Sequence, residues 1–185
     1  MHMLSRIISR IASRSLAKAA VSIPTNIHSK YIRTPKMTPE EMSEFLATQR
    51  VVRIAFDAND ERYLIPLGYV WQGKTFYCMT QRGRKTRMAA VNPRVSFQVD
   101  DSCETRLFTY KSITGEGIFE IVTDVGEIER TMPAFASRFS DTPDWAQAES
   151  ATLWANGELV LARLRPQVMS GVCYAQSDGG KYAEI

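Results

Sequence analysis

Hydrophobic and polar residues alternate with a period of two along short segments in the middle of the chain. Val52, Ile54 and Phe56, for example, share one face of an extended segment, as in a half-buried strand. Turn residues follow at 57–60 and 72–74, at the spacing of hairpins. Alternation and turns together predict strands at 51–56, 63–70, 75–80, 94–100, 107–122 and 158–164.

Within residues 37–185, helical periodicity is confined to four short segments. Thr38, Pro39 and Glu41 form a helix start, with an N-cap, a proline in the first turn and a capping box. Trp145 and Trp154, in the last helical segment, are expected to be packing residues. The predicted helices are 39–49, 85–91, one capped by Asp124 and one opened by Pro143-Asp144.

These elements predict a fold that is mainly β with helices. Short strands at hairpin spacing favour an antiparallel β-barrel decorated with helices. The strands do not alternate regularly with crossover helices, which argues against a parallel α/β sheet. With 185 residues, we expect one domain at 37–185, preceded by an extension at 1–36.

The extension is basic and amphipathic. Four of its basic residues recur at every fourth position, namely Arg6, Arg10, Arg14 and Lys18. The extension contains no acidic residue. Three interpretations stay open: a cleaved mitochondrial targeting peptide, an arm that packs on the domain or a partner, or a gene start placed too early, with Met37 the initiator. A targeting peptide implies location in the mitochondrial matrix. If the protein is prokaryotic, we expect it in the cytoplasm.

The net charge of +3 conceals an asymmetry between the extension and the domain. Seven of the 23 basic residues lie in 1–36, which leaves 16 basic and 20 acidic residues, a net charge of −4, in the rest. The isoelectric point of about 8.8 therefore does not argue for nucleic-acid binding. No apolar run approaches the roughly 18 residues of a membrane span.

Cysteine and histidine usage limits the chemistry of the domain. Cys78, Cys103 and Cys173 lack a C-x-x-C spacing, so we interpret them as free thiols. His2 and His28 both lie in the extension, so the domain has no histidine base, histidine triad or His-ligated zinc. We predict no metal site, and no residue stands out as a general acid or base.

A compact basic turn follows the third predicted strand. Gly83 lies among Arg82, Arg84 and Lys85, with Thr80 just before them and a short helix after them. Fixed positive charge and the free N–H groups of a helix start both favour an anion such as phosphate. Lys85 is the strongest candidate, because neighbouring cations on a turn cannot all point inward. A solvated turn is the structural alternative.

The order of four motifs resembles one protein family from about Met37 to about Val172. The motifs are M-T-P-E-E-M-S-E-F-L, I-P-L-G-Y-V-W-Q-G-K-T-F-Y-C-M-T, T-Q-R-G-R-K with N-P-R-V-S-F-Q-V, and L-V-L-A-R-L-R-P. In this order they resemble the FMN-binding split-barrel proteins, the pyridoxamine phosphate oxidase-like group. Small flavin reductases, including nitroimidazole-reductase-like proteins, look like the nearer relatives.

The resemblance implies a six-stranded antiparallel split barrel with flanking α-helices, and a homodimer with FMN near the subunit interface. It implies phosphate contacts from Thr80, Arg82, Arg84 and Lys85. It implies that the flavin ring lies along Pro66, Leu67, Gly68 and Tyr69, and that Ser112 contacts the flavin or the partner. The chain lacks the second-strand arginine and core histidine of the pyridoxamine phosphate oxidases proper, so vitamin B6 oxidation is not expected.

Two functional hypotheses follow. The first is an FMN-dependent oxidoreductase in which reduced nicotinamide loads the flavin and a small molecule is then reduced; the cofactor supplies the chemistry, so no catalytic residue is assigned. The second is a split-barrel protein that binds a deazaflavin or haem, or that stores flavin with little catalysis.

Overall fold

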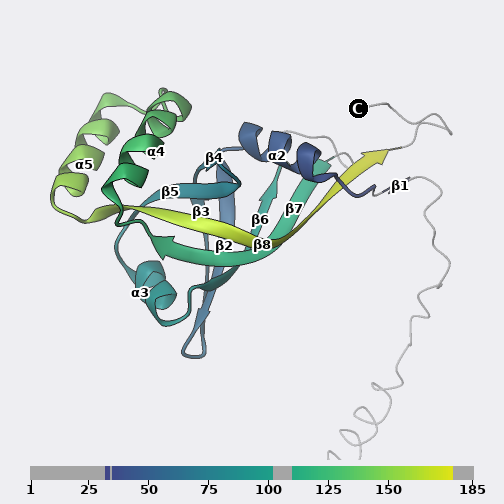
Figure 1. The fold of residues 1–185 in the computed structure, drawn as a ribbon, viewed down its shortest axis with the longest axis horizontal. Coiled ribbons are helices and arrows are strands. Elements are labelled where there is room, and N and C mark those ends of the chain that lie inside the picture. The colour runs from purple at the N-terminus through teal and green to yellow at the C-terminus, as the bar shows by residue number, and fades with distance from the viewer. Residues whose placement is uncertain (1–31, 34, 102–109, 177–185) are drawn as a thin grey trace, which may run out of the picture. The chain divides into compact units, whose positions relative to one another are not determined.

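The computed structural model describes residues 32–33, 35–101 and 110–176 (Figure 1). The predicted basic helix of the extension, Cys103 and residues 177–185 lie outside the described residues. The described residues belong to one compact unit. Within it, Ile32–Arg33 (β1) pairs with the last strand, and Lys36 forms a bridge to Val172. The final residues of the predicted extension thus belong to the sheet.

The described residues form one antiparallel sheet of eight strands. Its order is β3-β2-β6-β7-β8-β5-β4, with β1 on β8. Its two ends, β3 and β4, are consecutive in the chain, and β3 also contacts β5, so the sheet curls until its ends meet. Besides β1, the strands are Val51–Ala58 (β2), Glu61–Gly68 (β3), Val70–Gln72 (β4), Thr75–Gln81 (β5), Arg94–Asp100 (β6), Tyr110–Ile121 (β7) and Leu159–Gln176 (β8).

This architecture confirms the predicted antiparallel split barrel with flanking helices, with two short strands, β1 and β4, beyond the predicted six. The predicted strand 63–70 was wrong at both ends. A two-residue turn at Asn59 and Asp60, both with φ near +60°, starts β3 at Glu61. Tyr69 then separates β3 from β4, because its side chain turns into the core.

The last strand is much longer than the predicted 158–164. β8 pairs in succession with β5, β7 and β1, and this pairing keeps it extended through the weakly patterned segment after Leu164. A bulge between Glu116 and Gly117 of β7 accommodates the extra residue of β8 next to Pro166.

The helices begin where their capping residues predict. Thr38 Oγ1 accepts a hydrogen bond from Glu41 N at 3.2 Å, and the Glu41 carboxylate accepts one from Thr38 N at 2.6 Å. Asp124 accepts from Glu127 N at 2.6 Å. The helices are Pro39–Thr48 (α2), Arg84–Val91 (α3), Val125–Arg138 (α4) and Asp144–Ala155 (α5).

Aromatic rings fill the barrel. Phe76 contacts Tyr69, Trp71 and Phe97 edge-to-face, with ring centroids 5.0, 4.7 and 5.1 Å apart. A second apolar cluster, which includes Val70 and Phe135, packs α4 against the sheet. Trp154 packs against this second cluster as predicted, but the Trp145 side chain is 71% exposed, so its predicted packing role was wrong for the single chain.

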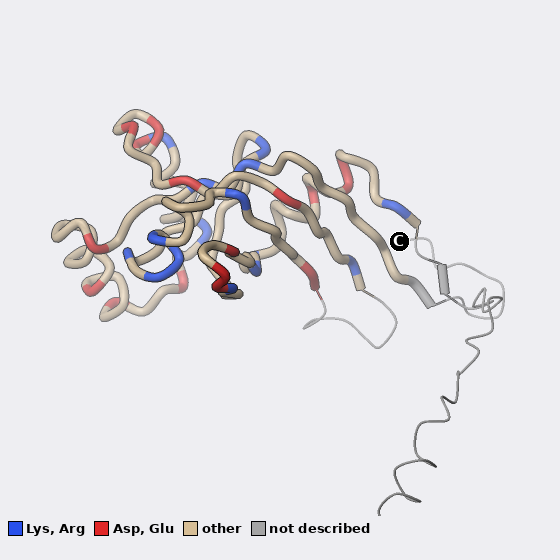
Figure 2. Tube along the Cα trace, turned by 90° about the horizontal axis from the view of Figure 1, so that it is seen from below, with Lys and Arg blue, Asp and Glu red and all other residues tan. Residues whose placement is uncertain are grey.

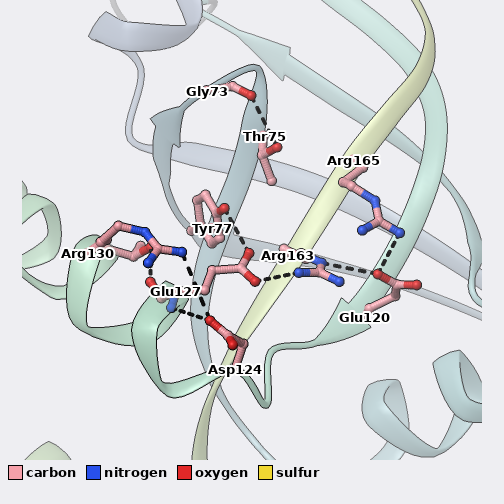
Figure 3. Close-up of polar contacts among 10 residues, drawn as sticks. Gly73, Thr75, Tyr77, Glu120, Asp124, Glu127, Arg130, Arg163 and Arg165 are labelled. Carbon is pink, nitrogen blue, oxygen red and sulfur yellow. Dashed lines mark hydrogen bonds and ion pairs between the residues drawn. The ribbon is translucent and has the colours of Figure 1, made fainter.

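A polar network also attaches α4 to the sheet (Figure 3). Arg163 of β8 donates to Glu120 of β7 at 3.1 Å and to Glu127 of α4 at 2.5 Å. The Tyr77 hydroxyl of β5 donates to the same Glu127 carboxylate at 2.9 Å. Burial is the main cause of a raised pKa for Tyr77, followed by this hydrogen bond. The network joins three strands and one helix.

Gly115→Ala should lower the free energy of unfolding by about 1–3 kcal/mol. A Cβ atom at Gly115 would lie 2.3 Å from the Val168 carbonyl oxygen and 2.6 Å from the Phe97 ring, so β7 or β8 must shift. Urea denaturation measures the change. Thr114→Ala, at the exposed neighbouring position, is the control and should change stability little. Equal stability of the two variants would contradict the close β7–β8 contact.

Arg163→Met should destabilise the protein by about 1–2 kcal/mol, because Glu127 loses its charged partner in a partly buried setting where solvent screens part of the loss. Glu127→Gln should cost less when Arg163 is already Met than in the wild type. A double-mutant cycle of thermal or urea unfolding measures this coupling. Additive effects would show that the two residues do not stabilise each other.

Candidate functional site

The β5–α3 turn forms a helix start without a side-chain cap. Gly83 is the N-cap of α3 and has no side-chain oxygen to accept from the first turn. Thr86 Oγ1 accepts from Gly83 N and donates to Gly83 O, both at 2.9 Å, which fixes the bend. The first N–H groups of α3 thus combine with the positive end of the helix dipole, an arrangement that favours an anion.

Two of the predicted phosphate ligands have protein partners. The Arg84 guanidinium lies 2.9 Å from a Glu61 carboxylate oxygen and 4.8 Å from the centroid of the Tyr63 ring, so it joins α3 to β3. Arg82 Nε donates to Gly157 O at 3.0 Å, which attaches the turn to the connection before β8. These contacts leave Arg82 and Arg84 as supports of the turn.

Lys85 has a different environment from these arginines. It is half-buried at the start of α3, and burial lowers the pKa of its ammonium group. No carboxylate of the described residues forms a salt bridge with Lys85. Thr80, predicted as a second phosphate contact, is 5% exposed on β5. Lys85 therefore has a charge available for an anionic ligand at the helix start.

The predicted ring-binding segment lies at the end of β3. In the described sheet β3 pairs only with β2, so it forms one side of the seam where the curled sheet meets itself. Pro66 is exposed and Leu67 and Gly68 are partly exposed. Tyr69 is fully buried, its hydroxyl donates to Leu46 O at 2.7 Å and its N–H donates to Arg50 O at 3.0 Å, so in this chain it has no exposed surface for a cofactor contact.

The two halves of the predicted site lie along the same seam. At one end, Arg84 of α3 contacts Glu61 at the start of β3. At the other end, Gly68 of β3 and Met79 of β5 line one cavity. Because Thr80 directly follows Met79, a ligand with a phosphate near Thr80 and a flat ring at Gly68 would lie along the seam between β3 and β5.

Ser112, predicted to contact the flavin or the partner, lies on β7 and not on the seam strands. It pairs with Asp100 of β6 and Val172 of β8, so β2 and β6 stand between it and β3. Ser112 is 9% exposed, between β6 and β8.

Sequence reasoning missed the residues that hold the turn in place. Glu61, Tyr63 and Gly157 fix the two arginines, and Phe139 covers Gly68 from the end of α4, with its ring 3.2 Å from where a Cβ of Gly68 would lie. Glu61 is 23 residues from Arg84 and Gly157 is 75 from Arg82, so no local pattern connects them.

Figure 2 shows basic and acidic residues spread over the strands of the sheet. In the described part of the chain, no group of three or more His, Cys, Asp or Glu residues has a geometry suited to a metal ion. The helices described above are also too short or too polar to cross a membrane.

Comparisons with known proteins identify the family and the fold. The family model for pyridoxamine 5'-phosphate oxidase matches residues 38–172. An uncharacterized protein of Rhizobium meliloti is 29% identical over 79 residues, 43% of this chain and 52% of that protein, so the match spans about half the length of this curated relative.

Solved structures share the fold. A FAD-binding protein from Mesorhizobium loti has a TM-score of 0.61 and 25% identity, over 80% of this chain and 99% of its own. A proposed 5-nitroimidazole antibiotic resistance protein from Bacteroides thetaiotaomicron has a TM-score of 0.58 and 15% identity, over 78% of this chain and 90% of its own. The haem-storage protein HutZ from Vibrio cholerae has a TM-score of 0.54 and 21% identity, over 71% of this chain and 92% of its own. These matches confirm the predicted resemblance, and the chain belongs to the pyridoxamine 5'-phosphate oxidase family.

Proposed function

We propose that this protein binds FMN along the β3–β5 seam and is an oxidoreductase acting on a small molecule. The observation that carries the proposal is Lys85, a half-buried cation without a salt-bridge partner among the described residues, at the uncapped start of α3. A phosphate there gains a charge-assisted hydrogen bond and the N–H groups of the helix start.

The residues divide into three roles. Lys85, Thr80 and the α3 backbone bind the phosphate, while Arg82 and Arg84 hold the turn in position. Pro66, which is exposed, and Leu67 and Gly68, which are partly exposed, border the flavin ring. When bound, FMN supplies hydride and electron transfer between a nicotinamide donor and the substrate.

A homodimer is part of the proposal. The resemblance assigns Ser112 to the flavin or the partner subunit, and in this chain β2 and β6 separate Ser112 of β7 from β3. In a dimer, Ser112 of one copy can reach the flavin bound by the other. Family membership and the FAD-binding protein of similar structure support a flavin.

The absorption spectrum of the purified protein tests the cofactor directly. We expect a yellow protein whose spectrum has flavin bands. Denaturation should release FMN, and the refolded apoprotein should bind added FMN again. A haem spectrum would instead support the haem-binding alternative, and a deazaflavin has its own absorption. A colourless protein that does not bind added FMN would overturn the proposal.

Lys85→Met should weaken FMN binding about ten- to a hundredfold, because a charge-assisted hydrogen bond contributes about 1.5–3 kcal/mol. Quenching of FMN fluorescence during titration of the apoprotein measures the dissociation constant. Arg87→Met is the matched control, since Arg87 is an exposed cation on the same helix. Equal losses in the two variants would show that net charge alone attracts the ligand.

FMN binding should weaken as the pH rises through the pKa of Lys85. Burial places this pKa below the ordinary value, so the ammonium loses its charge at a lower pH than an exposed lysine. Lys85→Arg keeps the charge and should bind FMN with a flatter alkaline profile. Dissociation constants measured across the alkaline range for both proteins check this. Identical profiles would exclude Lys85 as the titrating contact.

A further inference from the structure

A cavity of about 500 Å³ lies between the sheet and the helices α4 and α5. Its sheet side includes Gly68 and Met79, and its α4 side includes Met132, Phe135 and Phe139. None of the residues that line it carries a charge. The volume falls within the range of sites for small molecules, roughly 300–1,000 Å³. The proposed phosphate contacts Thr80 and Lys85 do not line it.

The aromatic wall of the cavity is held in place from behind. The rings of Phe135 and Phe139 stack with centroids 5.9 Å apart and planes 18° from parallel. The Arg50 guanidinium lies 5.3 Å from the centroid of the Phe139 ring and is itself paired with Asp141 at 2.6 Å. These neighbours fix the Phe139 ring, and the Phe135–Phe139 pair forms an apolar aromatic wall that another ring can contact edge-to-face.

The remaining lining is polar but neutral. Gln147 Nε2 donates to Thr142 O at 2.7 Å, and the hydroxyl-bearing residues Ser140 and Ser150 also line the cavity. A charged ligand would lose its hydration on entering this cavity, and no oppositely charged lining residue would compensate for that loss. A neutral ring with one or two hydrogen-bonding groups matches both kinds of lining.

We propose that this cavity binds a neutral, flat molecule of one or two fused rings, packed against the wall formed by Phe135 and Phe139. Gly68 belongs both to the cavity and to the strand assigned to the flavin ring. A molecule bound here would therefore lie beside the flavin and belong to the substrate class of the protein. This assignment of the substrate rests on the proposed function, whereas binding in the cavity does not.

The neutral fluorescent probe prodan, a flat naphthalene that carries a ketone and a dimethylamino group, tests the cavity on the full-length protein. The wild type should enhance the fluorescence of the probe in a saturable manner. Ala136→Trp places an indole in the cavity from α4, and should weaken binding at least tenfold. Ser137→Trp, at the exposed next position outside the cavity lining, is the matched control and should bind as the wild type does.

A second variant and a second readout separate the possible results. Ser150→Phe fills the cavity from α5 and should act like Ala136→Trp, and circular dichroism checks that each variant is folded. Absence of saturable binding to the wild type, or equal binding by Ala136→Trp and Ser137→Trp, would overturn the proposal. Displacement of the probe by FMN, one for one, would also overturn it, because the cavity would then be the flavin site.

FMN titrations of the same proteins distinguish the two proposals. Unchanged FMN affinity in Ala136→Trp, together with loss of the probe, supports a separate ligand site beside the flavin. Probe binding by a wild type that binds no FMN would contradict the flavin function and would still support the cavity as a site for neutral rings.

Discussion

Burial of Tyr69 holds the two ends of the curled sheet together. The residue lies between β3 and β4, its ring packs on Phe76 in the core, and its hydroxyl donates to Leu46 O. Its own N–H donates to Arg50 O at 3.0 Å, just before β2 begins. A buried hydroxyl without a partner is costly, so these contacts specify where the chain leaves β3. The seam that carries the candidate site exists because the sheet closes here.

The same closure separates the cations of the basic turn by role. In sequence they are neighbours of equal charge, but the start of β3 supplies Arg84 with a carboxylate and a ring, and the start of β8 supplies Arg82 with a carbonyl. Lys85 receives no such partner from the described residues and is partly desolvated. A cation in that position is suited to a specific anion, within a domain whose overall charge is negative.

α4 and α5 link the seam to a second feature. α4 is attached to the sheet by the apolar cluster around Phe135 and by Glu127, which bonds to both Tyr77 and Arg163. This attachment holds Phe139 against Gly68 and forms the neutral cavity beside the strand assigned to the flavin. The proposed cofactor site and the proposed ligand site therefore depend on the same packing.

Local patterns predicted most of the elements and part of the site. The capping residues Thr38 and Asp124, the alternation in β2 and β6, and the Gly83 turn act over a few residues, so the sequence reveals them directly. The order of these motifs also identified the fold family. The break at Tyr69, the length of β8 and the exposure of Trp145 depend on distant neighbours, and local reasoning missed them.

The sequence by itself determined that a cluster of cations precedes a helix in an otherwise acidic, histidine-free domain. Only the tertiary structure decided which cation stays available, because the partners Glu61 and Gly157 approach through the folding of the sheet. It also decided that Ser112 lies on β7 with β2 and β6 between it and β3, since the strand order of the sheet sets that position. Charge type is a property of the sequence, whereas desolvation and pairing are properties of the packed chain.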